Sequence, residues 1–342
     1  MAMTDAPLFR ALTGAEPAAR RRALAKSITL LESTRADHRV RADQLLNELL
    51  PSTGRAMRLG VSGVPGVGKS TFIEALGLAL IAKGHRVAVL AIDPSSSLSG
   101  GSILGDKTRM EQLSVNEAAY IRPSPASGTL GGVAEKTREA MLVCEAAGYD
   151  VVIVETVGVG QSETAVASMT DMFVLLQLPN AGDDLQAIKK GVMELADLVV
   201  INKADIDVHA ATRAQAQIAS SLRLLGLQGR PEHAHHNAKI WHPRAMQLSA
   251  LKSEGIDRFW AAIEEFRALQ SANGGVTVKR QQQAQAWMWE RIHAGLRQQF
   301  SQAPAVRAML ADTTEKVLSG QLAASTAARQ LLNQFSGDKP HA

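Results

Sequence analysis

The chain has 342 residues, of which 46% are hydrophobic and 20% charged, so it is a globular protein too long for one minimal domain. The formal net charge of +4 is small for this length, and no dense basic block carries interleaved aromatic residues, so nucleic-acid binding has little support. No run of about 18 apolar residues occurs, which argues against a membrane span. The first residues lack the apolar stretch of a secretion signal, and one cysteine, Cys144, leaves no disulfide framework or multi-cysteine metal site, so we expect a reduced, cytoplasmic setting.

Residues 1–56 are expected to form a helical extension that packs on the domain after it. Alanine, leucine and arginine dominate the segment, and its apolar residues recur with helical spacing until a Pro-Ser-Thr-Gly break at residues 51–54. The arginine triplet at residues 20–22 is interpreted as a solvated helix face, with a docking site as the alternative. The periodic apolar positions are Leu24, Ile28, Leu31, Val40, Leu45, Leu46 and Leu49.

The segment at residues 58–71, RLGVSGVPGVGKST, is the centre of the predicted domain. A short apolar run, the spacing Gly-x4-Gly-Lys-Ser and an apolar-periodic stretch indicate a strand, a phosphate-binding loop and a helix. Glycines let successive backbone N–H groups approach a phosphate, and the helix directs its positive end toward the same anion. Lys69 is expected to reach the β- and γ-phosphates and Ser70 to bind Mg²⁺. The loop residues expected to bind the nucleotide are Gly63, Val64, Pro65, Gly66, Val67, Gly68, Lys69, Ser70 and Thr71.

Further apolar runs predict a mostly parallel sheet that helices cover on both faces. The runs at 86–92, 149–154, 171–178 and 197–201 are continuous, as in strands buried on both sides. The fold class predicted is therefore α/β. Ligands of such sheets bind at the carboxyl ends of the strands.

Acidic residues at these strand ends are candidate metal ligands. Asp93 follows the run at 86–92, Asp106 lies in the Ser/Gly-rich segment after it, and Glu155 ends the next buried run. Mg²⁺ keeps several waters and accepts only a few carboxylates. We therefore expect Ser70, Asp93, Asp106 and Glu155 around the metal, while a turn former remains the alternative for Asp93 and a helix cap for Asp106.

The segment from Glu155 to Glu163 matches the position of a γ-phosphate switch. Guanine-nucleotide switches have Asp-x-x-Gly here, and this chain has Glu155 in place of the aspartate, with Gly158 correctly spaced. The N–H of Gly158 is expected to sense the γ-phosphate. Gln161 or Glu163 is expected to position the attacking water, and the sequence does not choose between them.

A second motif, Asn202-Lys203-Ala204-Asp205, selects the base. An aspartate accepts hydrogen bonds from both N1–H and the 2-amino group of guanine, Asn202 is expected to meet O6 and N7, and the Lys203 stem to cover the ring. Adenine presents the opposite pattern and leaves these groups unpaired. The backbone of Ser249, Ala250 and Leu251 is expected to complete the guanine pocket.

The C-terminal part is predicted to be helical. A helix through Phe259 and Phe266 closes the core domain, 271–275 is interpreted as a linker, and the tail from Val276 carries separate apolar helix faces that need partners. We prefer a homodimerisation arm for this tail. The predicted division is 1–56 for the helical extension, 57–270 for the nucleotide-binding domain and 271–342 for the arm.

Taken together, these strings resemble the MeaB/ArgK/MMAA family of P-loop GTPases. The resemblance runs from about Leu59 to Leu251 and into both flanks. Glu155 is the family's own residue at its position, and Ser-Ser-Ser at 95–97 is a minor departure from the relatives. The strings that carry the resemblance are GVPGVGKST, AIDPSSSLSGGSILGDKTRM, VETVGVGQSE, LQLPNAGDDLQAIKKG and NKAD.

The resemblance implies a homodimeric P-loop NTPase of the SIMIBI type that binds GTP or GDP with Mg²⁺. Relatives chaperone the adenosylcobalamin-dependent methylmalonyl-CoA mutase, gating cofactor delivery, and they hydrolyse GTP slowly alone and faster with the partner. Residues 179–190 match an additional switch of the family. The residues placed by resemblance in catalysis are Lys69, Asp93, Asp106, Glu155 and Gly158, and those in switching and partner signalling are Gln161, Asp183 and Lys189.

Two other functions remain open at this stage. A kinase that transfers phosphate to a small molecule or protein is one, although no residue stands out as a base that activates an acceptor. A GTPase that inserts a metal centre is the other, but Cys144 alone cannot form the usual cysteine cluster. The histidines from His233 to His242 could bind a metal, and a polar surface loop is the preferred interpretation.

Overall fold

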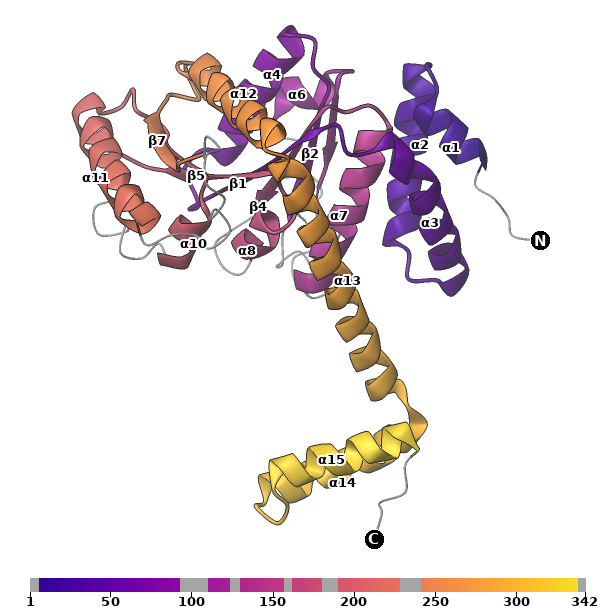
Figure 1. The fold of residues 1–342 in the computed structure, drawn as a ribbon. Helices are drawn as coiled ribbons and strands as arrows, with labels where there is room; N and C mark the ends of the chain where they lie inside the picture. Colours follow the sequence, from indigo (N-terminus) through magenta and orange to yellow (C-terminus); the bar gives the residue numbers. More distant parts are fainter. Residues whose placement is uncertain are drawn as a thin grey trace. The chain divides into compact units, whose positions relative to one another are not determined.

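A computed structural model describes residues 6–92, 110–123, 130–156, 162–179, 190–227 and 241–337 (Figure 1). The chain divides into two compact units, residues 1–278 and 279–342, which are described separately below. The three-part division at residues 56 and 270 stays a prediction. Among the described helices, none combines the length and the apolar character needed to cross a membrane.

The first unit is built on a seven-stranded sheet in the order β3-β2-β4-β1-β5-β6-β7, with every neighbouring pair parallel. Every residue of β1, β2, β4, β5 and β6 is buried, because helices cover both faces. The predicted α/β class is confirmed. The strands are β1 (Met57–Gly63), β2 (Val87–Ile92), β3 (Ala119–Arg122), β4 (Val151–Thr156), β5 (Met172–Gln177), β6 (Leu198–Ile201) and β7 (Arg244–Gln247).

Two apolar clusters fill the space between the sheet and its helices. Alternate residues of one strand supply both clusters: Phe173 and Leu175 of β5 belong to one, and Val174 and Leu176 belong to the other. Figure 1 shows α4, α6 and α12 on one face of the sheet and α7, α8 and α10 on the other. The described helices between β1 and the end of the sheet domain, which include α11, are α4 (Lys69–Ala82), α6 (Glu111–Val115), α7 (Leu130–Ala146), α8 (Ser162–Ala167), α10 (Lys190–Leu195), α11 (Val208–Leu227) and α12 (Ile256–Ala272).

Three N-terminal helices, α1 (Ala6–Thr13), α2 (Pro17–Glu32) and α3 (Ala36–Leu49), pack against the core through α7. Their predicted apolar stripe is buried at Leu24, Ile28 and Leu31. The prediction was wrong for Val40, which is 67% exposed. The buried residues of α3 are Ala42, Leu45 and Leu49, so helical spacing alone assigned Val40 to the wrong face.

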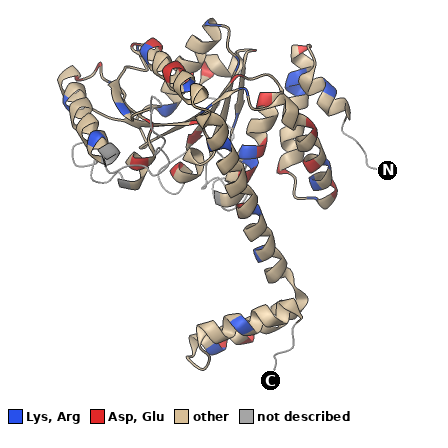
Figure 2. Ribbon diagram, in the orientation of Figure 1, with Lys and Arg blue, Asp and Glu red and all other residues tan. Residues whose placement is uncertain are grey.

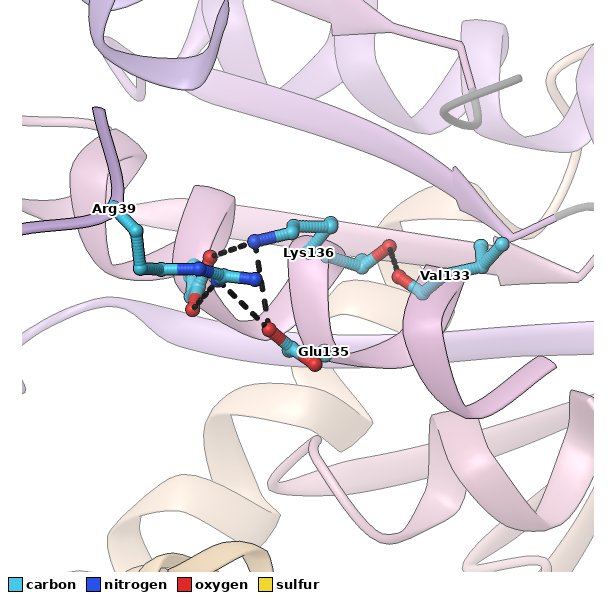
Figure 3. Close-up of polar contacts among 6 residues, drawn as sticks. Arg39, Val133, Glu135 and Lys136 are labelled. Carbon is cyan, nitrogen blue, oxygen red and sulfur yellow. Dashed lines mark hydrogen bonds and ion pairs between the residues drawn. The ribbon is translucent and has the colours of Figure 1, made fainter. Parts of the chain in front are cut away.

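A network of charges joins α3 to α7 (Figure 3). Arg39 Nη1 lies 3.1 Å from Glu135 Oε1 and 3.9 Å from Glu139 Oε1. Lys136 Nζ lies 3.4 Å from Glu135 Oε1 and 3.1 Å from Glu139 Oε2. Burial raises the pKa of Glu139, and the charge of Lys136 opposes that rise. Two cations and two carboxylates thus neutralise each other where the N-terminal helices meet the core.

The helix before the second unit departs from the sequence prediction. α12 continues through Ala272 and α13 (Gly275–Gln302) begins three residues later, so the expected linker at 271–275 shortens to residues 273–274. Gly274 makes the break, with a φ of 68° that favours glycine.

In the second unit, the remainder of α13 is followed by α14 (Pro304–Leu318) and α15 (Ala324–Ser336). The last two helices pack on each other, and the rings of Phe300 and Phe335 meet edge to face at 5.5 Å. The helical tail is therefore confirmed. Large apolar side chains remain exposed on this unit: Met288, Trp289, Leu296, Leu318 and Leu332.

Arg58 and Glu145 form a buried ion pair in the first unit. Arg58 Nε donates to Glu145 Oε1 at 2.5 Å, and only 11% and 1% of the two side chains are exposed. The second carboxylate oxygen accepts from the N–H of Gly54. One carboxylate on α7 therefore fixes both β1 and the turn that leads into it.

We expect Glu145→Gln to lower the free energy of unfolding by about 3 kcal/mol, because it leaves the Arg58 charge buried without its counter-ion. Thermal and denaturant unfolding measure this loss. The matched control is Glu265→Gln, which removes a pair with Arg244 whose side chains are 45% and 48% exposed. That change should cost less than about 1 kcal/mol. Equal losses in the two variants would contradict the structural role of Glu145.

Candidate nucleotide-binding site

The phosphate-binding loop lies between β1 and α4. Gly63 ends the strand and Lys69 begins the helix, as the motif predicts. Gly66 and Gly68 adopt φ values of 78° and 92°, a region that side chains disfavour. A Cβ at Gly66 would have no atom within 4 Å, so the loop is open on that side. The helix α4 begins at Lys69, directly after this loop, so the positive end of its dipole lies at the loop, which suits an anion.

Lys69 extends back along the loop from the start of α4. Its Nζ donates to Gly63 O at 2.6 Å and lies 3.4 Å from Val64 O. The ammonium group is thereby held against the backbone of the loop whose glycines would enclose a phosphate. A fixed positive charge here suits the β- and γ-phosphates of a nucleotide.

Asn202, at the end of β6, connects the phosphate loop to the loop after β7. Its Nδ2 donates to Val67 O at 2.9 Å, and its Oδ1 accepts from Ala250 N at 3.0 Å. Only 1% of the residue is exposed. A Cβ at Gly68 would lie 2.8 Å from Asn202 Nδ2, so only glycine allows this approach. Asn202 thus holds the two loops together, a contact that the motif had not predicted, and its role toward O6 and N7 stays a prediction.

The other residues of the base motif lie beside the same two loops. Lys203 has a φ of 59°, and its Nζ donates to Gly66 O at 2.8 Å, so its stem crosses the edge of the phosphate loop. A hydrogen bond from Ser249 holds the pKa of Asp205 below its usual range. Lys252 Nζ lies 3.8 Å from Asp205 Oδ2. The carboxylate is therefore ionised and oriented, as an acceptor for two guanine N–H groups must be.

Ser249, Ala250 and Leu251 follow β7 at the same edge of the sheet. The backbones of Ser249 and Glu254 exchange two hydrogen bonds of 3.0 Å, which close this loop into a tight hairpin. Leu251 at its tip is 81% exposed. The structure therefore brings together the phosphate loop, Asn202 to Asp205, and the loop at 249–251, as predicted.

Glu155 is a described residue predicted for the switch side of the site, and that role stays a prediction. It is the second-last residue of β4, is 3% exposed, and pairs in register with Val61 of β1 and Ala91 of β2. Next to it, the hydroxyls of Thr156 and Ser62 are 2.9 Å apart. Glu155 is thus at the carboxyl edge of the sheet, one strand from the phosphate loop.

Glu163, the alternative to Gln161 for positioning the attacking water, lies in the first turn of α8 and is 4% exposed, and its role stays a prediction. The other predicted site residues lie outside the described ranges, so their roles stay predictions as well. Within those ranges, no group of three or more His, Cys, Asp or Glu side chains is placed to hold a metal ion. Of the predicted metal ligands, Ser70 and Glu155 are described. The undescribed site residues are Asp93, Asp106, Gly158, Gln161, Asp183 and Lys189.

Two residues near the site escaped the sequence prediction. The Ser249 side chain acts on Asp205, whereas only the backbone of this loop was expected to contribute. Gln177 ends β5, is 1% exposed, and its amide has no hydrogen-bond partner among the described residues. The sequence did contain a signal for this position, because Gln177 is a polar residue at the end of an otherwise apolar strand.

Comparisons with known proteins agree with this geometry. The family model described as methylmalonyl Co-A mutase-associated GTPase MeaB matches residues 24–305. A putative GTPase of Caulobacter vibrioides is 54% identical over 315 residues, which cover 92% of this chain and 94% of that protein. GTPase ArgK of Escherichia coli is 52% identical over 269 residues, or 78% of each chain. The mouse protein named methylmalonic aciduria type A homolog, mitochondrial, is 47% identical over 326 residues, 92% of this chain and 76% of its own.

A solved structure extends the agreement to the fold. The crystal structure described as LAO/AO transport system kinase superposes with a TM-score of 0.74 at 39% identity, and the match covers 97% of each chain. The matched regions include the phosphate loop and the Asn-Lys-Ala-Asp motif described above. The chain is therefore a P-loop GTPase that belongs to the MeaB family.

Proposed function

We propose that this GTPase is a chaperone of an adenosylcobalamin-dependent acyl-CoA mutase, which it loads with cofactor and protects from inactivation. The observation that carries the proposal is the match of residues 24–305 to a family described as methylmalonyl Co-A mutase-associated. The mouse relative, named for methylmalonic aciduria, supports the same partner. The partner is thus a mutase of the methylmalonyl-CoA class.

The described residues support roles for several parts of a hydrolytic site. Lys69 and the first turn of α4 would hold the phosphates, and Asp205 would hold guanine. Ser70 and Glu155 are oxygen donors at the same edge of the sheet, which is the chemistry that Mg²⁺ prefers. The metal would offset negative charge on the β- and γ-phosphates. With Asp93 and Asp106, these residues form the proposed metal shell.

The nucleotide would control the partner through a difference in affinity. A ligand shifts a conformational equilibrium only as far as it binds one state better than the other. The segments after β4 and β5, which carry Gly158, Gln161, Asp183 and Lys189, are the proposed switches. A mutase that binds best to the GTP-bound form would, by the same coupling, raise the affinity of this GTPase for GTP.

A homodimer is part of the proposal. The second unit exposes Trp289, Leu296, Leu318 and Leu332 on helices that bury few residues of their own. Apolar helix faces of this kind are stabilised by packing on another surface. A second copy of the arm offers a matching apolar face.

A kinase is the second candidate, favoured by the description of the structural relative as a transport system kinase. It predicts that the γ-phosphate appears on an acceptor instead of as inorganic phosphate. Insertion of a metal centre is less well supported, because the side chain of Cys144 is fully buried in α7 and burial raises the pKa of its thiol.

We expect the mutase to accelerate GTP hydrolysis by at least tenfold, since partner binding can complete the charge stabilisation that an isolated GTPase lacks. Steady-state release of inorganic phosphate, with and without mutase, measures the effect. Lys69→Ala is the control, because it should abolish tight GTP binding and hydrolysis in both conditions. A rate that the mutase leaves unchanged would contradict the chaperone proposal, and phosphate on an acceptor would favour the kinase.

Asp205→Asn should weaken GTP binding by about 100-fold, because two hydrogen bonds to a charged acceptor are lost. Xanthosine triphosphate should gain affinity in the same variant, since its 2-oxo group can accept from the new amide. Calorimetry with both nucleotides gives the ratio. The matched control is Asp207→Asn, whose side chain caps α11 at Ala210 N and should leave both affinities unchanged. An unaltered GTP/XTP ratio for Asp205→Asn would refute its role in reading the base.

A further inference from the structure

A second cluster of positive charge lies at the edge of the sheet opposite the nucleotide-binding loops. Arg86 directly precedes β2 and Tyr149 lies two residues before β4, so both are at the amino ends of parallel strands. Arg20 and Arg21 come from the first turns of α2, and Figure 2 shows basic positions along α2. Arg20, Arg21 and Arg86, together with Gly148 and Tyr149, are called the distal arginine cluster below.

The guanidinium groups of this cluster converge on Gly148 and Tyr149. The Arg86 Cζ lies 4.4 Å from the centroid of the Tyr149 ring, and its Nη1 donates to Ala147 O at 2.9 Å. A Cβ at Gly148 would lie 3.1 Å from Arg86 Nη1 and 3.9 Å from Arg20 Nη1. Burial raises the pKa of Tyr149, and the charges of Arg86 and Arg21 oppose that rise.

No carboxylate among the described residues forms an ion pair with these three arginines. Asp150, which follows Tyr149, accepts from the Arg86 backbone N at 2.7 Å and lies 2.7 Å from the His85 ring. Arg21 Nη1 has only a long contact of 3.4 Å to Asn116 O. The Nε of Arg20 is buried without a hydrogen-bond partner, and both burial and the charge of Arg86 lower the pKa of Arg20. Like charges that are brought together away from water repel each other unless an anion lies between them.

We propose that the distal arginine cluster is a binding site for a phosphoryl group, separate from the nucleotide site. A dianion neutralises more of the three charges than a carboxylate does, and the planar forks of arginine match phosphate oxygens in pairs. Gly148 has a φ of 81° and carries no side chain, which lets Arg86 Nη1 and Arg20 Nη1 both approach the backbone at this position. The occupant is a free phosphate ion or a small phosphate ester. Its binding would tie α2 of the N-terminal helices to the start of β2 and β4.

Calorimetry on the full chain, saturated with GDP and Mg²⁺ in a buffer free of phosphate and sulfate, tests the site. Inorganic phosphate should bind, and Arg20→Ala should raise its dissociation constant by about tenfold through loss of one charged fork. The control is Arg22→Ala on the same helix, which should bind as the unaltered chain does. A second titration with glycerol phosphate distinguishes the two possible occupants. If glycerol phosphate binds as tightly as inorganic phosphate, the site accepts a phosphate ester. If inorganic phosphate alone binds, the occupant is the free ion.

Thermal unfolding without phosphate separates a binding role from a structural one. Arg20→Ala should unfold at the same temperature as the unaltered chain or higher, because it removes the repulsion with Arg86, and it should lose the stabilisation that phosphate gives. Phosphate binding with an unchanged dissociation constant in Arg20→Ala would belong to the nucleotide site and would overturn the proposal. The absence of any signal, or a marked fall in the unfolding temperature of phosphate-free Arg20→Ala, would overturn it equally.

Discussion

The hydrogen bonds of Asn202 are the constraint on which the nucleotide site depends. Its amide donates to Val67 in the phosphate loop, 135 positions earlier in the chain, and accepts from Ala250 in the loop after β7. Because the side chain is buried, neither bond competes with bulk water, and the loss of either would leave an unpaired polar group. The surfaces that face phosphate and guanine are thereby parts of one rigid arrangement.

The parallel sheet makes this contact possible. β5 alone separates β1 from β6, and the register pairs Gly63 with Leu176 and Gln177 with Ile201. All three strands therefore end at nearly the same level, and the loops that follow them meet. Lys203, which donates to Gly66 O, adds a second link between the base motif and the phosphate loop. Sheet topology thus turns two distant motifs into one binding site.

The motifs and most elements could be predicted from the sequence because their signals are local. Continuous apolar runs identified the buried strands, and the spacing around Lys69 identified the strand, loop and helix that hold the phosphates. Val40 was assigned to the wrong face because periodicity cannot show which neighbour a helix will meet. The predicted linker before α13 was too long. Small and polar residues such as Ser271 can continue a helix when tertiary packing supports it.

The side-chain contacts of the site could not be predicted in the same way. The two bonds of Asn202 and the bond from Ser249 to Asp205 join residues that are far apart in sequence, and only the folded sheet places them together. The unpaired amide of Gln177 is likewise visible only once burial is known. Apart from Glu155 and Glu163, the switch half of the site, with Asp93 and Gly158, lies outside the described residues, so the sequence motifs remain its basis.

The most direct test of the central claim is the affinity of the nucleotide site for pyrophosphate, measured by displacement of GDP from the unaltered chain and from Asn202→Ala. Pyrophosphate has no base, so it reports on the phosphate loop alone. If Asn202 holds that loop in its binding conformation, the variant should bind pyrophosphate about tenfold more weakly. If pyrophosphate affinity is unchanged while GTP affinity falls, Asn202 only reads the base, and the account of one joined site is contradicted.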